Sequence, residues 1–125
     1  MARRAKILLV DDDELSLEIM QARLAERYDV VATNAPENAL KLAREVEPDL
    51  IVCDFDMPEM DGADISAALA ADEELRHTPL IFLTALATTG DMNRMGKQIA
   101  GRRAVSKDAP FEQLVARIEE LLKVE

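Results

Sequence analysis

The stretch that decides the fold reads Asp49-Leu-Ile-Val-Cys-Asp-Phe-Asp-Met-Pro-Glu-Met-Asp-Gly62. Its apolar run, residues 50–53, is short and contains β-branched side chains, which predicts a strand buried on both faces rather than a helix. The run ends at the carboxylate of Asp54, and Pro58 and Gly62 then predict a loop. Ligand and reaction sites of open α/β sheets lie just beyond the carboxyl ends of their strands. We therefore interpret Asp54 as a residue placed for chemistry rather than for packing.

Three other short runs also end in polar side chains. Residues 7–10 precede three aspartates, residues 80–83 precede Thr84, and residues 102–106 precede Lys107. If these strands are parallel, their carboxyl ends share one edge of the sheet, where ligand sites form. We then expect five side chains to converge at that edge: Asp11, Asp12, Asp54, Thr84 and Lys107.

The segments between these runs predict helices and one more strand. Apolar spacing and proline positions indicate helices over residues 14–27, from Asn34 and Pro36 to Pro48, over 63–71 and 88–99, and from Pro110 onward. Residues 28–33 are typical of a strand. Five strand–helix units with short links predict an α/β fold, a doubly wound (βα)5 parallel five-stranded sheet with helices on both faces.

The first predicted helix has two apolar stripes and an acidic start. One of the aspartates at 11–13 caps it, and Asp13 is best interpreted as that cap. One stripe is formed by Leu17, Met20 and Leu24. The other stripe, on roughly the opposite side, is formed by Leu15, Ile19 and Ala22. Two stripes predict that more than one neighbour buries this helix.

Composition bounds the function. The chain has 125 residues, of which 49% are hydrophobic and 32% charged, which is typical of a single soluble domain. A net charge of −10 argues against nucleic acid and anionic membranes as partners. The single cysteine, Cys53, is expected to be buried and suits a reducing cytoplasm. No segment has the length of a signal peptide core or a membrane span.

A cluster of Asp11, Asp12 and Asp54 would need a cation. Like charges about 4 Å apart repel by about 4 kcal/mol per pair at an effective dielectric near 20. Three carboxylates and one ammonium, that of Lys107, sum to −2, which one divalent ion neutralises. Oxygen ligands favour Mg²⁺, with Mn²⁺ as the alternative.

The same residues fit phosphoryl transfer. Asp54 would be the nucleophile that forms an aspartyl phosphate. The metal and Lys107 would neutralise charge on the equatorial oxygens, and the Thr84 hydroxyl would donate to another oxygen. Each of these residues alone would be an ordinary cap, surface charge or satisfied hydroxyl, so the prediction rests on their combination. Other acids, and His77, are interpreted as solvated surface.

As a set, these residues resemble the receiver domains of two-component response regulators, the CheY-like family. The resemblance covers about residues 6–122. It rests on the acidic pair after Leu-Leu-Val, on residues 54–62, on Leu83-Thr84-Ala85, and on Lys107.

The resemblance implies a function and a sheet order. Asp54 would accept a phosphoryl group from a histidine kinase or phosphotransfer protein, and the strands would be ordered 2-1-3-4-5. Mg²⁺ would be held by Asp12, Asp54 and the backbone carbonyl of Asp56, with Asp11 acting mainly through water. Thr84 and Lys107 would sense the phosphate and shift a two-state surface formed by residues 88–99, residues 102–106 and the last helix.

Three departures from the family pattern stand out. The family usually has a cis Lys-Pro bond where Lys107 is followed by Asp108, and a cis non-proline bond costs about 2.5–4 kcal/mol. Ala104 stands at the position of the family's switch aromatic, so the usual ring readout is missing or replaced. The side chain of Asp56 is an extra acid beside the site. It either tunes the lifetime of the aspartyl phosphate by orienting water or is simply solvated.

We expect residues 1–125 to form a single receiver domain without an output domain. The protein would be cytoplasmic, a monomer or phosphorylation-linked dimer, and would act on a downstream protein target. It would not be an enzyme, apart from slow loss of its own phosphoryl group. The main alternative is a receiver-like interaction module that works without phosphorylation. A remote alternative is an aspartate-nucleophile phosphatase of the haloacid dehalogenase type, which Asp54-x-Asp56 also resembles.

One further hypothesis concerns basic residues in this acidic chain. Near the expected output surface lie Arg94, Lys97, Arg102 and Arg103. They either bind an acidic partner or only keep this edge soluble.

Overall fold

The structure is a computed structural model that describes residues 4–55, 57, 62–84, 98–99, 102–107 and 109–122. Its strands are β1 (Lys6–Val10), β2 (Asp29–Thr33), β3 (Leu50–Asp54), β4 (Leu80–Thr84), β5 (Gln98–Ile99) and β6 (Arg102–Ser106). Its helices are α1 (Glu14–Leu24), the 3-10 helix η1 (Pro36–Asn38), α2 (Ala39–Val46), α3 (Gly62–Ala71) and α5 (Phe111–Leu122). Among the described residues, no helix has both the length and the apolar character that a membrane span requires.

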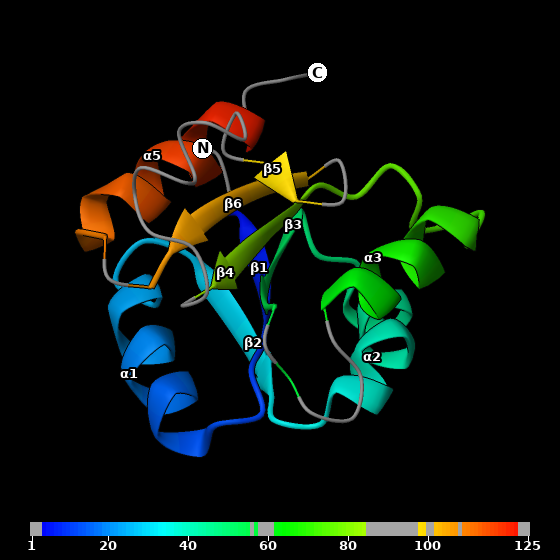
Figure 1. Ribbon diagram of the computed structural model, residues 1–125, viewed down its shortest axis with the longest axis horizontal. Coiled ribbons are helices and arrows are strands. Elements are labelled where there is room, and N and C mark those ends of the chain that lie inside the picture. The colour runs from blue at the N-terminus through cyan, green and yellow to red at the C-terminus, as the bar shows by residue number, and fades with distance from the viewer. Residues whose placement is uncertain are drawn as a thin grey trace.

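The sheet has the order β2-β1-β3-β4-β6-β5. The first five strands in this order pair in parallel, which confirms the predicted (βα)5 fold and its strand order, with β6 as the fifth parallel strand. β5 adds a short antiparallel strand at the edge (Figure 1).

The predicted helix over residues 88–99 is wrong at its end. Gln98 and Ile99 are strand residues that pair with Arg103 and Arg102. A strand edge offers unpaired backbone groups to any neighbouring segment, and a two-residue link such as 100–101 is short enough for a hairpin. The rest of that predicted helix lies outside the described residues.

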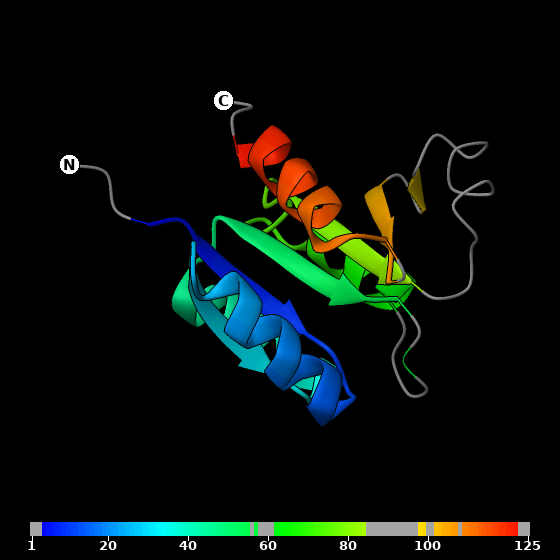
Figure 2. The same cartoon turned by 90° about the vertical axis from the view of Figure 1, so that its left-hand side faces the viewer.

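The sheet separates two hydrophobic clusters. One lies under α2 and α3 and includes Leu8, Ile51 and Phe82 of the strands. The other lies under α1 and α5 and includes Leu9, Val52 and Leu83. Figures 1 and 2 show these two pairs of helices on opposite faces of the sheet. Successive strand residues point to opposite faces, so the central strands are buried throughout, as β3 is from Leu50 to Asp54.

The helices begin and end near the predicted residues, and α1 is shorter than predicted. The side chain of Asp13 accepts the backbone N–H of Leu15 at 3.1 Å, which confirms Asp13 as the cap of α1. α1 ends at Leu24 rather than at residue 27. α2 ends at Val46. The next residue, Glu47, caps the helix in a left-handed conformation (φ 51°) just before Pro48 and donates its N–H to the carbonyl of Ala43.

The second apolar stripe of α1 is not covered, contrary to prediction. Leu24 of the first stripe is fully buried, but Leu15 and Ile19 of the second are 66% and 53% exposed. Only one face of α1 meets the sheet, and the second stripe faces away from it. These two residues are the large hydrophobic side chains that the described part of the chain leaves exposed.

Two identical substitutions on α1 test this assignment. We expect Leu24→Ala to lower the free energy of unfolding by about 2–5 kcal/mol, because it leaves a cavity in the core. Leu15→Ala should change it by less than about 0.5 kcal/mol, since the side chain is mostly in water already. Urea unfolding followed by circular dichroism measures both. Equal losses would show that the second stripe is buried after all.

Candidate functional site

The site begins at the end of β1. Asp11 and Asp12 follow Val10 directly, and the backbone N–H of Asp11 donates to the Thr33 carbonyl at 3.2 Å, which extends the pairing of β1 with β2. The Asp11 carboxylate accepts the backbone N–H of Asp13 at 3.0 Å. Asp11 is 5% exposed, so this carboxylate is held in place and largely removed from water.

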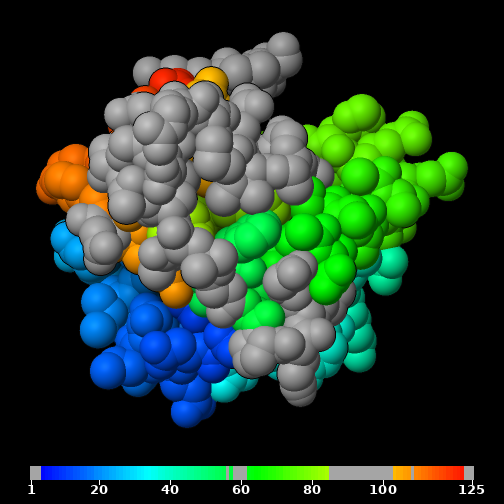
Figure 3. Space-filling view, in the orientation of Figure 1, coloured from blue at the N-terminus to red at the C-terminus, as the bar shows by residue number. Residues whose placement is uncertain are grey.

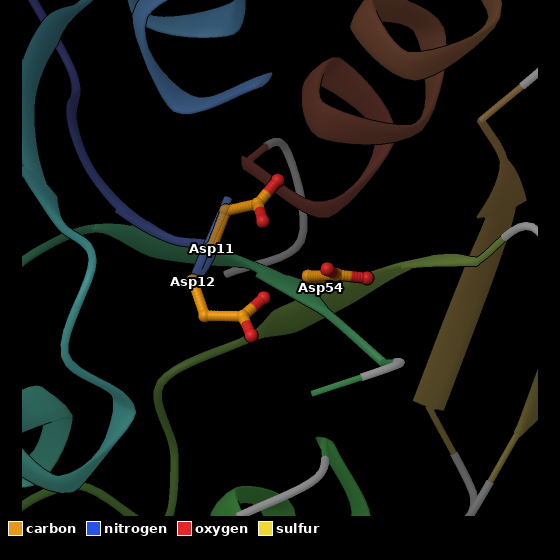
Figure 4. A group of neighbouring side chains, drawn as sticks. All are labelled: Asp11, Asp12 and Asp54. Atoms are coloured by element: carbon orange, nitrogen blue, oxygen red, sulfur yellow. The ribbon is translucent and has the colours of Figure 1, made fainter. Parts of the chain in front are cut away.

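Asp54 lies beside this pair because β3 is the neighbour of β1. Val10 is paired with Cys53, so the residues that follow each of them meet at the same edge of the sheet. Carboxylate oxygens of Asp11, Asp12 and Asp54 all lie within 4.8 Å of one another. Figure 4 shows the three side chains gathered at the ends of β1 and β3.

Lys107, which follows β6 directly, reaches Asp54. Its Nζ lies 3.1 Å from Oδ1 of Asp54. Its backbone N–H donates to the carbonyl of Thr84 at 2.9 Å, which fixes the end of β6 against the end of β4. Thr84 is fully buried as the last residue of β4. The structure thus brings all five predicted residues to one edge of the sheet, at the ends of four neighbouring strands.

The electrostatics of the cluster are visible at Asp11. Burial raises the pKa of its carboxyl group from 3.8 to about 6. The hydrogen bond from Asp13 and the charge of Lys107 act in the opposite direction, while the charge of Asp54 raises the pKa further. A carboxylate that resists ionisation beside another acid gains strongly from a bound cation.

The residues present fit a divalent metal ion. Ligand oxygens on opposite sides of one Mg²⁺ lie about 4 Å apart, so oxygens within 4.8 Å need only small side-chain rotations to share one ion. The donors are all oxygens, which favours Mg²⁺ or Mn²⁺ over softer metals. Asp56, whose carbonyl was predicted as a ligand and whose side chain was predicted to tune the site, lies outside the described residues.

The structure describes some of the other residues that the sequence analysis singled out. Ala104 is 2% exposed and paired with Phe82 of β4, so it is a packed core residue. The Lys107–Asp108 bond includes a residue outside those described. Of the basic group, Arg94 and Lys97 lie outside them too, and the structure describes the side chain of Arg103, 3.7 Å from Glu120.

Sequence reasoning missed a pocket of about 220 Å³ next to the cluster. Asp11 and Lys107 line one part of it, Ile19 and Arg23 of α1 another, and Phe111 of α5 a third. The Arg23 guanidinium lies over the Phe111 ring, 4.3 Å from its centroid, and bridges the two helices. No local signal links Arg23 with Phe111, because they are brought together only by the packing of α1 beside α5.

Comparisons with known proteins agree with this geometry. A family model described as the response regulator receiver domain matches residues 7–119. The chain is 35% identical over 117 residues to the polar-differentiation response regulator DivK of Brucella ovis, covering 93% of this chain and 94% of that protein.

Solved structures show the same fold. The chain is similar to chemotaxis protein CheY4 of Vibrio cholerae (TM-score 0.80, 23% identity, 95% of this chain and 99% of that one). It is also similar to the receiver domain of a sensor histidine kinase of Pseudomonas aeruginosa, described with a magnesium ion coordinated in its active site cleft. That match has a TM-score of 0.81 and 26% identity, and it covers 96% of this chain and 98% of the other.

The pKa of Asp11 predicts a pH-dependent stability in metal-free buffer. Its folded value, about 6, lies above its unfolded value near 3.8, so its stabilising contribution is complete below pH 3.8 and lost as the pH rises through 6. Asp11→Asn cannot ionise and escapes this loss. Between pH 4 and pH 7.5, we expect the free energy of unfolding of the variant to rise by up to about 3 kcal/mol relative to that of wild type.

Denaturant unfolding in EDTA at several pH values measures this gain. Glu18→Gln, which removes an exposed acid from α1, serves as the control and should follow the wild-type profile. Parallel profiles for Asp11→Asn and wild type would contradict the assignment.

Proposed function

Because the chain belongs to the response regulator receiver domain family, we propose that it is a phosphorylation-dependent signalling switch of a two-component system. The observation that carries the proposal is the position of Asp54. It ends the central strand, shares a cation-sized cluster with Asp11 and Asp12, and has an ammonium group 3.1 Å from its carboxylate.

In the proposed reaction, an oxygen of Asp54 attacks the phosphorus atom of a phosphohistidine. A P–O bond forms as the P–N bond to the histidine breaks, and the histidine nitrogen leaves. Mg²⁺, when bound at this site, would supply positive charge to the transferring phosphoryl oxygens. The magnesium-containing Pseudomonas receiver supports this choice of metal. Asp12 and Asp54 are the proposed direct ligands, with the Asp56 carbonyl, and Asp11 acts through water.

Lys107 and Thr84 are the proposed sensors. Lys107 already contacts the carboxylate that would carry the phosphoryl group, so a small rotation lets its ammonium meet a phosphoryl oxygen. Thr84 holds the Lys107 backbone through its own carbonyl, so β4 and β6 would respond together. We propose that this movement shifts the surface formed by residues 88–99, β6 and α5.

The remaining properties follow from the same proposal. Residues 1–125 act as one receiver domain that receives its phosphoryl group from a histidine kinase or phosphotransfer protein and engages a downstream protein, as a monomer or a phosphorylation-linked dimer. Cys53 is a buried thiol that donates to the backbone carbonyl of Asp54 at 3.3 Å, in keeping with the reducing cytoplasm that we propose. The chain would be no enzyme apart from slow self-dephosphorylation. A phosphatase of the haloacid dehalogenase type carries its nucleophile on the first strand, whereas Asp54 ends β3.

Phosphodonor docking involves the uncovered stripe of α1. A phosphohistidine can reach Asp54 only if its protein rests on the rim of the site. Leu15 and Ile19 project from α1, whose first residues follow the acidic pair, and the pocket continues from Ile19 to Lys107. α1 (blue) and the start of α5 (orange) lie next to each other on the left of Figures 1 and 3. Exposed apolar side chains beside a pocket are typical of a protein contact surface.

Replacement of the acceptor is the first test. We expect Asp54→Asn to abolish incorporation of phosphate from acetyl phosphate with Mg²⁺, because an amide is a far weaker nucleophile than a carboxylate. Mass spectrometry of the intact chain measures the adduct. Asp64→Asn, which changes an exposed acid of α3, should label like wild type. Persistent labelling of Asp54→Asn would refute the assignment.

The wild-type protein can also be used to distinguish the proposed switch from a phosphorylation-independent module and from a phosphatase. Beryllofluoride, which mimics the aspartyl phosphate, should change the amide NMR shifts of β6 and α5 in wild type. An unchanged spectrum would favour a module that works without phosphorylation. Steady turnover of a phosphomonoester would favour the phosphatase.

A charge on α1 tests the docking surface. We expect Ile19→Asp to slow phosphotransfer from a partner phosphohistidine protein about tenfold or more, since a buried interface charge without a partner is costly. Labelling by acetyl phosphate should not change, because a small donor needs no docking surface. Ala67→Asp places the same charge on the exposed face of α3 as a control. Equal slowing by both donors would locate the effect in the site itself.

A further inference from the structure

The first residue of α3 is in unusually close contact with β4. A Cβ placed on Gly62 would lie 2.6 Å from Cε1 of Phe82 and 2.9 Å from its Cδ1. It would also lie 3.0 Å from the Cα of Phe55. The backbone of Gly62 does not have a left-handed φ, so glycine is required here for space and not for conformation.

This contact lies at the base of the segment that follows Asp54. Phe55 donates its backbone N–H to the carbonyl of Leu83 at 2.8 Å, and its own carbonyl accepts the N–H of Gly62 at 3.1 Å. The peptide after Asp54 is therefore held on one side by β4 and on the other by the first turn of α3.

Phe82 has little freedom to yield to a larger residue. Its side chain is fully buried. The Phe55 ring meets it edge to face, with centroids 5.1 Å apart and planes at 80°. Met57, at 4% exposure, belongs to the same cluster. A shift of the Phe82 ring would therefore displace Phe55, and with it the backbone next to Asp54.

We infer that Gly62 is a positioning residue for the cation site. Its missing side chain lets α3 close on Phe82, and this closure fixes the backbone on the carboxyl side of Asp54. The inference rests on the proposed function, because it assigns Gly62 to the geometry of the proposed Mg²⁺ ligands. Atoms inserted into a packed core are accommodated by backbone shifts, and groups that orient metal ligands typically change affinity by ten- to a hundredfold when altered.

The test is Gly62→Ala in the full chain, with Mg²⁺ affinity measured by titration calorimetry. We expect the Kd to rise about tenfold. Labelling by acetyl phosphate should need correspondingly more Mg²⁺ for half its maximal rate, while the rate at saturating Mg²⁺ stays near wild type. Alanine is otherwise the better helix former, so propensity alone would not weaken the site.

A second variant identifies the contact. Phe82→Leu removes the Cε1 atom, so Gly62→Ala combined with Phe82→Leu should recover much of the lost Mg²⁺ affinity. Leu69→Ala, a cavity at the other end of α3, is the control for lost stability and should leave the Mg²⁺ Kd unchanged. Recovery by the double variant with no effect of Leu69→Ala supports the inference, also where Gly62→Ala alone fails to fold.

Three results would overturn it. One is Gly62→Ala binding Mg²⁺ as wild type does. Another is a double variant that fails to fold or binds Mg²⁺ no better than Gly62→Ala. The third is an equal loss of affinity in Leu69→Ala, which would reduce the effect to general stability. A wild-type chain that binds no Mg²⁺ would be a different failure, that of the proposed function itself.

Discussion

The rest of the site depends on carboxylates that strand pairing forces together. The parallel register of β1 and β3 brings Asp11, Asp12 and Asp54 within 4.8 Å, where each charged pair repels by about 4 kcal/mol at an effective dielectric near 20. Lys107 offsets part of this repulsion from 3.1 Å. Burial raises the pKa of the Asp11 carboxyl group, and the charge of Asp54 raises it further. The core of the sheet stabilises this arrangement, and a divalent cation is the group that would relieve it.

The sequence predicts what local patterns encode. A short apolar run followed by a polar residue locates the strand ends at Asp54 and Thr84, because burial on both faces is written in the run itself. Helical spacing locates the apolar stripes of α1 but not their neighbours, which is why the exposure of Ile19 was mispredicted. Gln98 and Ile99 become strand through pairing with β6, and the contact of Gly62 with Phe82 is also tertiary. Neither leaves a pattern along the chain.

At the position where the family usually has an aromatic switch residue, on β6, this chain has Ala104, and the aromatic side chain lies on the neighbouring strand β4 as Phe82. Ala104 is small and buried, and its partner in the register is Phe82. The Phe82 ring is confined between Gly62 and Phe55, so it cannot replace a ring that swings inward. A phosphoryl group on Asp54 would directly change its ion pair with Lys107. The proposed readout in this chain is therefore a movement of charge rather than of a ring.

Lys107 would also connect the proposed reaction to the proposed docking surface. Its side chain contacts Asp54 and lines the pocket that extends between α1 and α5 to Arg23 and Phe111. A partner that fills this pocket would contact Lys107, and the position of Lys107 would depend on whether Asp54 carries a phosphoryl group. Coupling between two binding events is reciprocal. If a phosphoryl group on Asp54 repositions Lys107 and so changes the affinity for a partner in the pocket, the bound partner changes the equilibrium between the two positions of Lys107 by the same factor. Acceptance of the phosphoryl group and release of its donor would then be one coupled event.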